Sequence, residues 1–475
     1  MVNSCKMIQA VQLFPSEREK LLTHLQPKLE TAPYLDRRMV SFQANKLEPG
    51  YRLFKYKEGF SSALVRHFLK EYAPTPGRLL DPFAGSGTAL FAGRELGWSV
   101  SGIELLPVGT LVTEAREAIG RLKPSALQKS LALFFANPEL PIDERFTYQH
   151  LSITKDAFPT NTEQSLNRYL TFCSNIRNKD LQTVMRFAAF PVLEEISYTR
   201  KDGQYLRWDS RSRRNLTGKP FDKGVIHDFE TAIANKIEQI IEDGDYFEQT
   251  IFPQRTESSD FRLVTGSCLE VLPICEPERF DFVITSPPYC NRYDYTRTYA
   301  LELAYLGVDD LALRKLRQNM LSCTVENKDK FLQMEELYRN IGKNDEFQMI
   351  ADVYARSEAM NEVNIILGKL NHENLLNNKN IARMVRNYFF EMCFVVFELA
   401  RVTRKGGHCV MVNDNVRYGG EEIPADLILS DFAQSFGYVI EKILVLPRGK
   451  GNSSQQMGNF GRTEIRKCVY VWRKD

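Results

Sequence analysis

The amino-acid sequence predicts an α/β protein built on one doubly wound, mostly parallel sheet. Three blocks of the chain point to this fold. Residues 77–105 read as strand, turn, helix and strand, a second α/β block begins at Phe261, and a third runs from about residue 384 to the end. Strands that alternate with helices are typical of βαβ units, whose strands lie parallel.

In the first block, the apolar runs GRLLD (77–81) and WSVSGIEL (98–105) have the length of strands. The segment TALFAGRELG between them has apolar residues at helical spacing and closes on Gly97, a residue type that favours helix ends. A further helix is expected over residues 60–73, because Pro74 and Pro76 would stop it.

The second block contains FRLVTG from residue 261, a helical turn, and FDFVITSPPY over 280–289. The third block contains an apolar helix, a strand, a second helix and two closing strands. Their expected ranges are 385–402, 407–414, 424–436, 438–446 and 466–472.

These blocks indicate one core that is interrupted twice. We expect the core to comprise 51–115, 261–305 and 384–475, preceded by a helical extension over 1–50. The mixed segment 116–260 and the polar, helical segment 308–383 are interpreted as insertions.

The composition is that of a globular protein, with 43% apolar and 26% charged residues in 475. The N-terminus lacks the apolar stretch of a signal peptide, and no run is long enough to span a membrane, so a cytoplasmic protein without a membrane partner is predicted. Nine cysteines without a CxxC pair and six unclustered histidines predict reduced thiols and no metal site. The net charge of +2 means that nucleic-acid binding would depend on local basic patches.

The first motif, DPFAGSG at 81–87, stands at the turn between a strand and a helix. Glycines there let a ligand approach backbone N–H groups, and Glu104, at the end of the next strand, can accept hydrogen bonds from ribose hydroxyls. Leu90 occupies the third position of a GxGxxG pattern, which favours a nucleoside cofactor without a pyrophosphate. The alternative is an ordinary tight turn with Glu104 as a surface acid.

The second motif, TSPPY at 285–289, follows an apolar strand. Two prolines remove two N–H donors and stiffen the turn, so its carbonyls can face a ligand. A hydroxyl at Ser286 and a flat ring at Tyr289 suit a planar base with an exocyclic amino group. The alternative is a proline-terminated strand with a buried tyrosine.

Together the two motifs resemble those of the S-adenosylmethionine-dependent DNA amino-methyltransferases, which modify cytosine N4 or adenine N6. The resemblance extends over about 51–115, 261–305 and 385–473, where GIELLP (102–107), RLVTGSCLEVLP (262–273) and RVTRKGGHCVMVND (401–414) are similar to further family motifs. It implies a Rossmann-like methyltransferase sheet with one antiparallel C-terminal strand.

The resemblance also implies roles for individual residues. S-adenosylmethionine would be the cofactor, bound by Asp81, Pro82, Phe83, Ala84, Gly85, Ser86, Gly87, Glu104 and Ser267. The catalytic turn would comprise Ser286, Pro287, Pro288 and Tyr289. Ser267 stands where many members have an aspartate. Cys290 lacks an evident thiolate activator in the sequence, and no catalytic role is expected for it.

Double-stranded DNA is the expected partner, and a cognate restriction endonuclease is a further candidate. The candidate DNA contacts are Arg207, Arg211, Arg213, Arg214, Arg292, Arg297, Arg448 and Lys450. For each charged run the alternative is a solvated face, and residues 291–299 could instead cap the following helix. By analogy with the family, 116–260 is a candidate target-recognition region.

The predicted function is site-specific methylation of an exocyclic amino group on a flipped base, with cytosine N4 favoured over adenine N6. The serine of TSPPY supports that preference. Two alternatives stay open, namely an RNA base methyltransferase and a non-catalytic DNA-binding partner.

Overall fold

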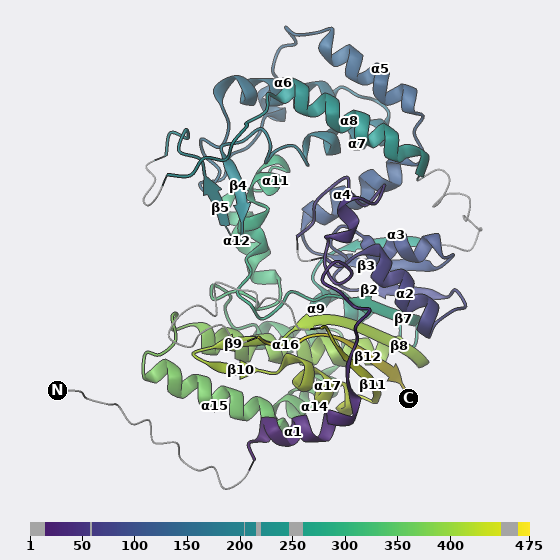
Figure 1. Cartoon of the computed structure of the whole chain (residues 1–475), viewed down its shortest axis with the longest axis vertical. Helices are drawn as coiled ribbons and strands as arrows, with labels where there is room; N and C mark the ends of the chain where they lie inside the picture. Colours follow the sequence, from purple (N-terminus) through teal and green to yellow (C-terminus); the bar gives the residue numbers. More distant parts are fainter. Residues whose placement is uncertain (1–14, 58, 204, 215–219, 247–259, 448–463) are drawn as a thin grey trace, which may run out of the picture.

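A computed structural model of the chain describes residues 15–57, 59–203, 205–214, 220–246, 260–447 and 464–475. Its centre is one eight-stranded sheet with the order β1-β11-β12-β8-β7-β2-β3-β6 (Figure 1). The strands are β1 (Leu29–Thr31), β2 (Arg78–Asp81), β3 (Ser99–Glu104), β6 (Phe261–Thr265), β7 (Phe280–Thr285), β8 (Thr403–Asp414), β11 (Tyr438–Val445) and β12 (Lys467–Lys474).

Only β12 runs against its neighbours in this sheet. It pairs antiparallel with both β8 and β11, whereas the other five pairings are parallel. The prediction of a mostly parallel sheet with an antiparallel C-terminal strand is therefore confirmed. The N-terminal segment adds something that the sequence analysis did not predict, because β1 pairs with β11 as an edge strand.

Helices cover both faces, and the strand sequences show why. In β7, Phe282 and Ile284 belong to the apolar cluster on one face, while Val283 between them belongs to the cluster on the other. Successive strand side chains point to opposite faces, so a strand that is apolar throughout must be covered twice. The helices α2 (Ser62–Tyr72), α3 (Thr88–Glu95) and α4 (Pro107–Ile119) cover the first face, and α16 (Ile381–Val402) and α17 (Ala425–Ser435) cover the second.

The described residues of 124–246 form the lobe at the top of Figure 1. Its described elements are α5 (Pro124–Phe135), α6 (Thr160–Ser174), α7 (Lys179–Ala189), α8 (Phe229–Tyr246) and the antiparallel hairpin β4 (Thr199–Asp202)–β5 (Tyr205–Trp208). Apolar side chains of α6, α7 and α8 belong to the same buried cluster as those of α2–α4. The lobe is thus packed onto the sheet layer rather than tethered to it.

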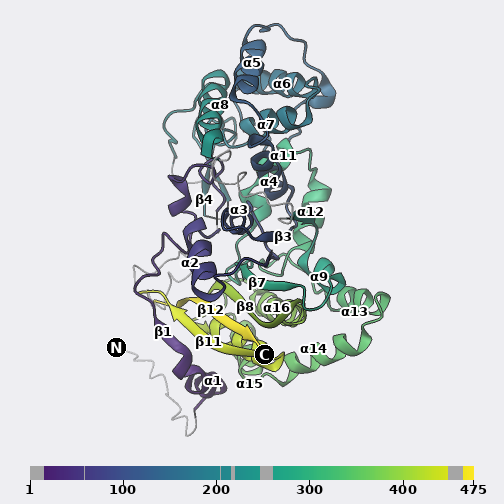
Figure 2. The ribbon, with the colours of Figure 1, turned by 90° about the vertical axis from the view of Figure 1, so that its right-hand side faces the viewer.

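The segment that follows β7 is helical and reaches both parts of the molecule. Its elements are α10 (Tyr295–Thr298), α11 (Ala300–Tyr305), α12 (Asp310–Asn319), α13 (Phe331–Asn340), α14 (Asn344–Arg356) and α15 (Glu358–His372). The last three lie beside α16 and α17 at the base of the molecule (Figure 2). The remaining described helices are α1 (Glu17–Leu25) and α9 (Cys268–Val271), and β9 (Val416–Tyr418) pairs with β10 (Glu421–Ile423).

The chain reverses its direction of winding at β2. From β2 it proceeds to β3 and β6 on one side, and it then crosses back to β7 and β8 on the other. In parallel sheets, ligands bind beyond the carboxyl ends of the strands at such a switch point. The turns that follow β2 and β7 carry the two sequence motifs, and both therefore stand at this position. In the described part of the chain, no helix has the length and apolarity to cross a membrane.

Candidate active site

The glycine-rich turn after β2 takes a conformation that requires glycine. Gly85 and Gly87 have φ angles of +53° and +77°, in the left-handed region, and Gly87 precedes the first residue of α3. A methyl group on Gly85 would come within 3.0 Å of the ring of Tyr56. The turn is therefore closely packed against the segment that precedes α2.

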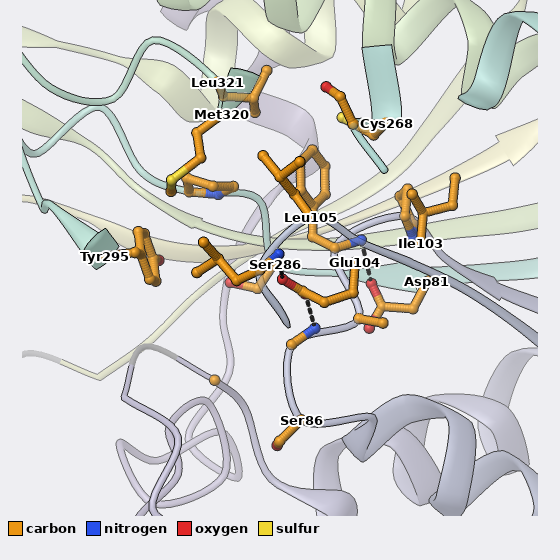
Figure 3. A pocket seen from close by; sticks show the side chains of 18 of the residues that line it. Asp81, Ser86, Ile103, Glu104, Leu105, Cys268, Ser286, Tyr295, Met320 and Leu321 are labelled. Carbon is orange, nitrogen blue, oxygen red and sulfur yellow. Dashed lines mark hydrogen bonds between the residues drawn. The ribbon is translucent and has the colours of Figure 1, made fainter. Parts of the chain in front are cut away.

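Glu104 ends β3 directly beside this turn (Figure 3). Its Oε2 accepts a hydrogen bond from the Gly85 backbone N–H at 2.6 Å, and its Oε1 accepts one from Leu106 at 2.7 Å. Burial raises the pKa of this carboxyl to about 8. Each carboxylate oxygen has a second lone pair, so Glu104 can hold the turn and still accept hydrogen bonds from a ligand.

Asp81 joins the ends of the two central strands. Its Oδ1 accepts hydrogen bonds from Thr285 Oγ1 at 2.7 Å and from the backbone N–H of Phe83 at 3.0 Å. Burial raises the pKa of this carboxyl to about 7. Since Thr285 immediately precedes Ser286, this contact fixes the glycine-rich turn relative to the proline turn.

A pocket with about 770 Å³ of empty space, partly open to solvent, lies over these groups. We call it the first cavity. Of the nine residues predicted to bind the cofactor, Gly87 alone is not part of the lining; it sets the start of α3 instead. The other eight line the cavity, together with Ser286 and Pro288, so the two motifs meet at one site.

A second cavity, also partly open to solvent and with about 1250 Å³ of empty space, adjoins the first. Tyr56 and Gly59 line both cavities. Ser286 and Pro288 face the first cavity, whereas Tyr289 lines the second. Ser286, Pro288 and Tyr289 therefore lie where the two spaces meet, whereas Pro287 lines neither cavity.

The hydroxyl groups of the proline turn are hydrogen-bonded to each other. Ser286 Oγ donates to Tyr289 Oη at 3.1 Å. A serine hydroxyl has one proton and two lone pairs, so a proton directed at Tyr289 leaves both lone pairs of Ser286 to accept from other donors. The neighbouring Cys290 is buried, and its burial raises the pKa of the thiol well above the ordinary value. The thiol therefore stays protonated.

Part of the first cavity comes from a segment that carried no motif. Asn319, Met320 and Leu321, at the end of α12, line it. Figure 3 shows Met320 and Leu321 on the side of the cavity away from Ser86. Ser267 Oγ donates to the Asn319 carbonyl at 3.1 Å, which fixes this segment to the start of α9. The sequence analysis missed these residues because they follow a polar helix without a recognisable pattern.

Two other supports of the glycine-rich turn were also missed. The guanidinium of Arg116 is buried and donates to the Ser86 carbonyl at 2.7 Å and to the Tyr51 carbonyl at 3.1 Å. Its burial lowers the pKa of Arg116 to about 10. Gly109, in the first turn of α4, lies so close that an added methyl group would be 2.2 Å from the Gly85 carbonyl oxygen.

The candidate DNA contacts fall into three groups. On the lobe, Arg211 pairs with Asp209 and Arg214 donates to the Ser152 and Lys155 carbonyls, so both make internal contacts. Arg207 is exposed, pairs with Asp202 at 3.4 Å and lies over the Phe221 ring, and Arg213 is exposed.

The second group follows the proline turn. Arg292 donates to Asn377, and Arg297 pairs with Asp294 and Glu326. Neither arginine lines the two cavities, whereas Tyr295 lines the first. The third group, Arg448 and Lys450, lies outside the described residues. Within the described residues, no cluster of three side chains suited to a metal ion occurs.

Comparison with known proteins gives long alignments. The chain is 45% identical over 476 residues to the type II methyltransferase M.AvaI of Nostoc sp., covering 99% of this chain and 95% of that protein. It is 40% identical over 471 residues to the type II methyltransferase M.BsoBI of Geobacillus stearothermophilus, covering 96% and 91%. A more distant relative is the type II methyltransferase M.MvaI of Kocuria varians, at 21% identity over 408 residues. No protein-family model matches the chain.

Proposed function

Because this chain belongs to the type II DNA methyltransferases, we propose that it transfers a methyl group from S-adenosylmethionine to the N4 amino group of a cytosine flipped out of DNA. The observation that supports this most strongly is the position of the proline turn. Ser286 and Pro288 line the first cavity and Tyr289 lines the second, and both cavities are partly open to solvent. A methyl donor and a base bound on either side would meet at this turn.

The residues of the first cavity fit a nucleoside cofactor. The buried Glu104 carboxylate has lone pairs for ribose hydroxyls, and Ile103, Leu105 and Met320 offer apolar contacts for an adenine ring. Phe83 and Tyr56 also line this cavity and offer apolar contacts for the methionine chain. When bound, S-adenosylmethionine supplies an electrophilic sulfonium methyl group.

Ser286 and the Pro287 carbonyl hold the amino group of the base. An exocyclic amine is a weak nucleophile because its lone pair is delocalised into the ring. Two acceptors aligned with its N–H bonds favour a pyramidal nitrogen, whose lone pair is then directed out of the ring plane. The hydrogen bond from Ser286 to Tyr289 prepares Ser286 as one of these acceptors.

Tyr289 and the rigid prolines position the base. The tyrosine ring faces the second cavity and provides a surface on which a flipped base can stack. Holding the amino nitrogen at a short distance from the methyl donor removes much of the entropic barrier to transfer. Since Cys290 stays protonated, these residues suit transfer to an amino group and provide no cysteine nucleophile for attack on the base.

Mass spectrometry of nucleosides tests the target atom. Duplex DNA is treated with the protein and isotopically labelled cofactor, digested, and analysed for N4-methylcytosine and N6-methyladenine. We expect label in N4-methylcytosine. Label in N6-methyladenine alone would overturn the cytosine assignment, and label that enters tRNA or rRNA but not DNA would overturn the DNA substrate.

The relatives named as type II methyltransferases suggest a role in restriction and modification. We propose that the methylated site is the recognition site of a cognate endonuclease in the cytoplasm. Sequencing of a host genome that expresses the gene, with detection of modified bases, would give that site. The endonuclease should then fail to cut the modified DNA.

A further inference from the structure

The second cavity has an unbalanced charge. Its described lining contains one carboxylate, Asp414, and five basic side chains, which we call the basic rim: Arg37, Lys46, Lys55, Lys57 and Lys467. The whole chain contains 62 basic and 60 acidic side chains, so this excess is local. Four of the five come from residues 37–57, which the sequence assigns to the predicted helical extension over 1–50 and to the start of the core.

Two of these lysines have no acidic partner among the described residues. Lys46 and Lys55 are exposed, and neither forms an ion pair with a described residue. The ammonium of Lys46 donates to the neutral side-chain oxygen of Gln43 at 2.6 Å. By contrast, Lys467 pairs with Asp414 at 2.6 Å.

The backbone that carries these lysines is fixed in place. Asn45 is fully buried and donates to the Phe60 carbonyl at 3.2 Å, while its side-chain oxygen accepts from the Ser62 N–H at 3.0 Å. Farther along, the Lys57 N–H donates to the Tyr299 hydroxyl at 2.7 Å. The segment rises from α1 past the C-terminal strands toward α4 (Figure 1). The ammonium groups are thus attached to a preformed wall of the cavity.

From this arrangement we infer that the basic rim binds the DNA phosphates that flank the flipped nucleotide. The inference rests on the proposed function, because it requires the base to enter the second cavity. A flipped nucleotide remains joined to its strand through two phosphates, which must pass the mouth of the cavity. Ammonium groups on that mouth would neutralise them and offset part of the cost of unstacking.

A double variant tests the inference. K46Q/K55Q removes two charges from the rim. As a matched control, K70Q/K405Q removes two exposed lysines near the amino ends of the strands, away from the cavities. Lys70 lies in the last turn of α2, shortly before β2 begins, and Lys405 lies at the start of β8, far along that strand from Asp414.

Binding is measured by fluorescence anisotropy as a function of salt, with a duplex that carries the methylated site found by sequencing. Each phosphate contact contributes about 0.9 to the slope of log K against log salt. K46Q/K55Q should therefore reduce the magnitude of the slope by about 1.8. For each phosphate contact that is lost, the increase in affinity between 1 M and 0.1 M salt becomes about 8-fold smaller. The control pair should retain the wild-type slope, and both variants should bind S-adenosylmethionine like wild type.

Uncharged methylphosphonate linkages beside the target base identify the phosphates involved. Wild-type protein should lose affinity when these linkages replace the flanking phosphates, and K46Q/K55Q should lose much less. A wild-type salt slope in K46Q/K55Q, or an equal loss with the methylphosphonate duplex, would overturn the inference. A wild-type protein that binds this DNA without methylating it would instead contradict the proposed function.

Discussion

Gly109→Ala tests whether α4 holds the glycine-rich turn in place. The substitution changes the helix propensity of α4 and the packing of α4 against the turn in opposite directions. Alanine normally stabilises a helix by about 0.5–1 kcal/mol relative to glycine. Here, however, the added methyl group would lie 2.2 Å from the Gly85 carbonyl oxygen and 2.8 Å from Glu104 Cγ. Both neighbours belong to the wall of the first cavity, so the turn must move away from α4.

Forcing a methyl group into a packed site costs about 1–3 kcal/mol, which exceeds the gain in helix propensity. We expect a net destabilisation of about 1–2 kcal/mol in urea unfolding, obtained by combining the two effects. The displaced turn should also weaken the hydrogen bond from Gly85 to Glu104. Calorimetry should then show S-adenosylmethionine binding weakened by about 10-fold or more, the equivalent of one hydrogen bond to a charged group.

Gly368→Ala is the matched control. Gly368 lies in α15, is exposed, and has no neighbouring atom within 4 Å of an added methyl group. This variant should be slightly more stable than wild type, with unchanged cofactor affinity. If Gly109→Ala behaved in the same way as Gly368→Ala, the argument that α4 holds the glycine-rich turn would be refuted.

Three further predictions concern the proline turn, Glu104 and the helical segment after β7. Ser286→Ala should lower turnover by about 100-fold with little change in cofactor affinity, because the variant loses an acceptor for the amino group. Tyr289→Phe should lower turnover by about 3- to 10-fold, because it removes only the hydroxyl that orients Ser286. Near-wild-type turnover in single-turnover assays would contradict these roles. The pKa of Glu104 is raised to about 8 in the folded protein, so between about pH 5 and 8 the folded state binds more protons than the unfolded chain at this residue, and stability falls as pH rises. In Glu104→Gln, the slope of unfolding free energy against pH should be less negative by up to about 1.4 kcal/mol per pH unit, and an unchanged slope would count against the raised pKa. Lys330→Met should destabilise the protein by about 3–5 kcal/mol, because it leaves the buried Glu391 carboxylate without the ammonium 2.9 Å away. The double variant with Glu391→Leu should recover most of that loss in urea titrations, and no recovery would argue against this explanation.

The sequence predicts most of the central sheet because its strands are short apolar runs that end at glycines and prolines. The runs before DPFAGSG and TSPPY became β2 and β7, and residues of both motifs line the first cavity. An apolar run is a local signal in the sequence, and it is enough to identify a strand that is buried on both faces. The long apolar helix before β8 was predicted for the same reason.

Features that depend on distant partners were not predictable in this way. Leu29–Thr31 is too short and polar to indicate a strand, and it becomes one because the edge of β11 is available to it. Met320 lines the first cavity because Ser267 fixes the end of α12, a contact across 52 residues of sequence. Arg211 and Arg214 belong to a basic run, yet their contacts within the lobe could only be identified from the fold.

The contribution of Asn319, Met320 and Leu321 to the first cavity has a consequence during synthesis of the protein. The glycine-rich turn leaves the ribosome more than two hundred residues before these three do, and β8, on which β7 packs, follows later still. A nascent chain can therefore complete the walls of the first cavity only after most of the polypeptide has been made. We expect fragments released before that point to lack a complete cavity.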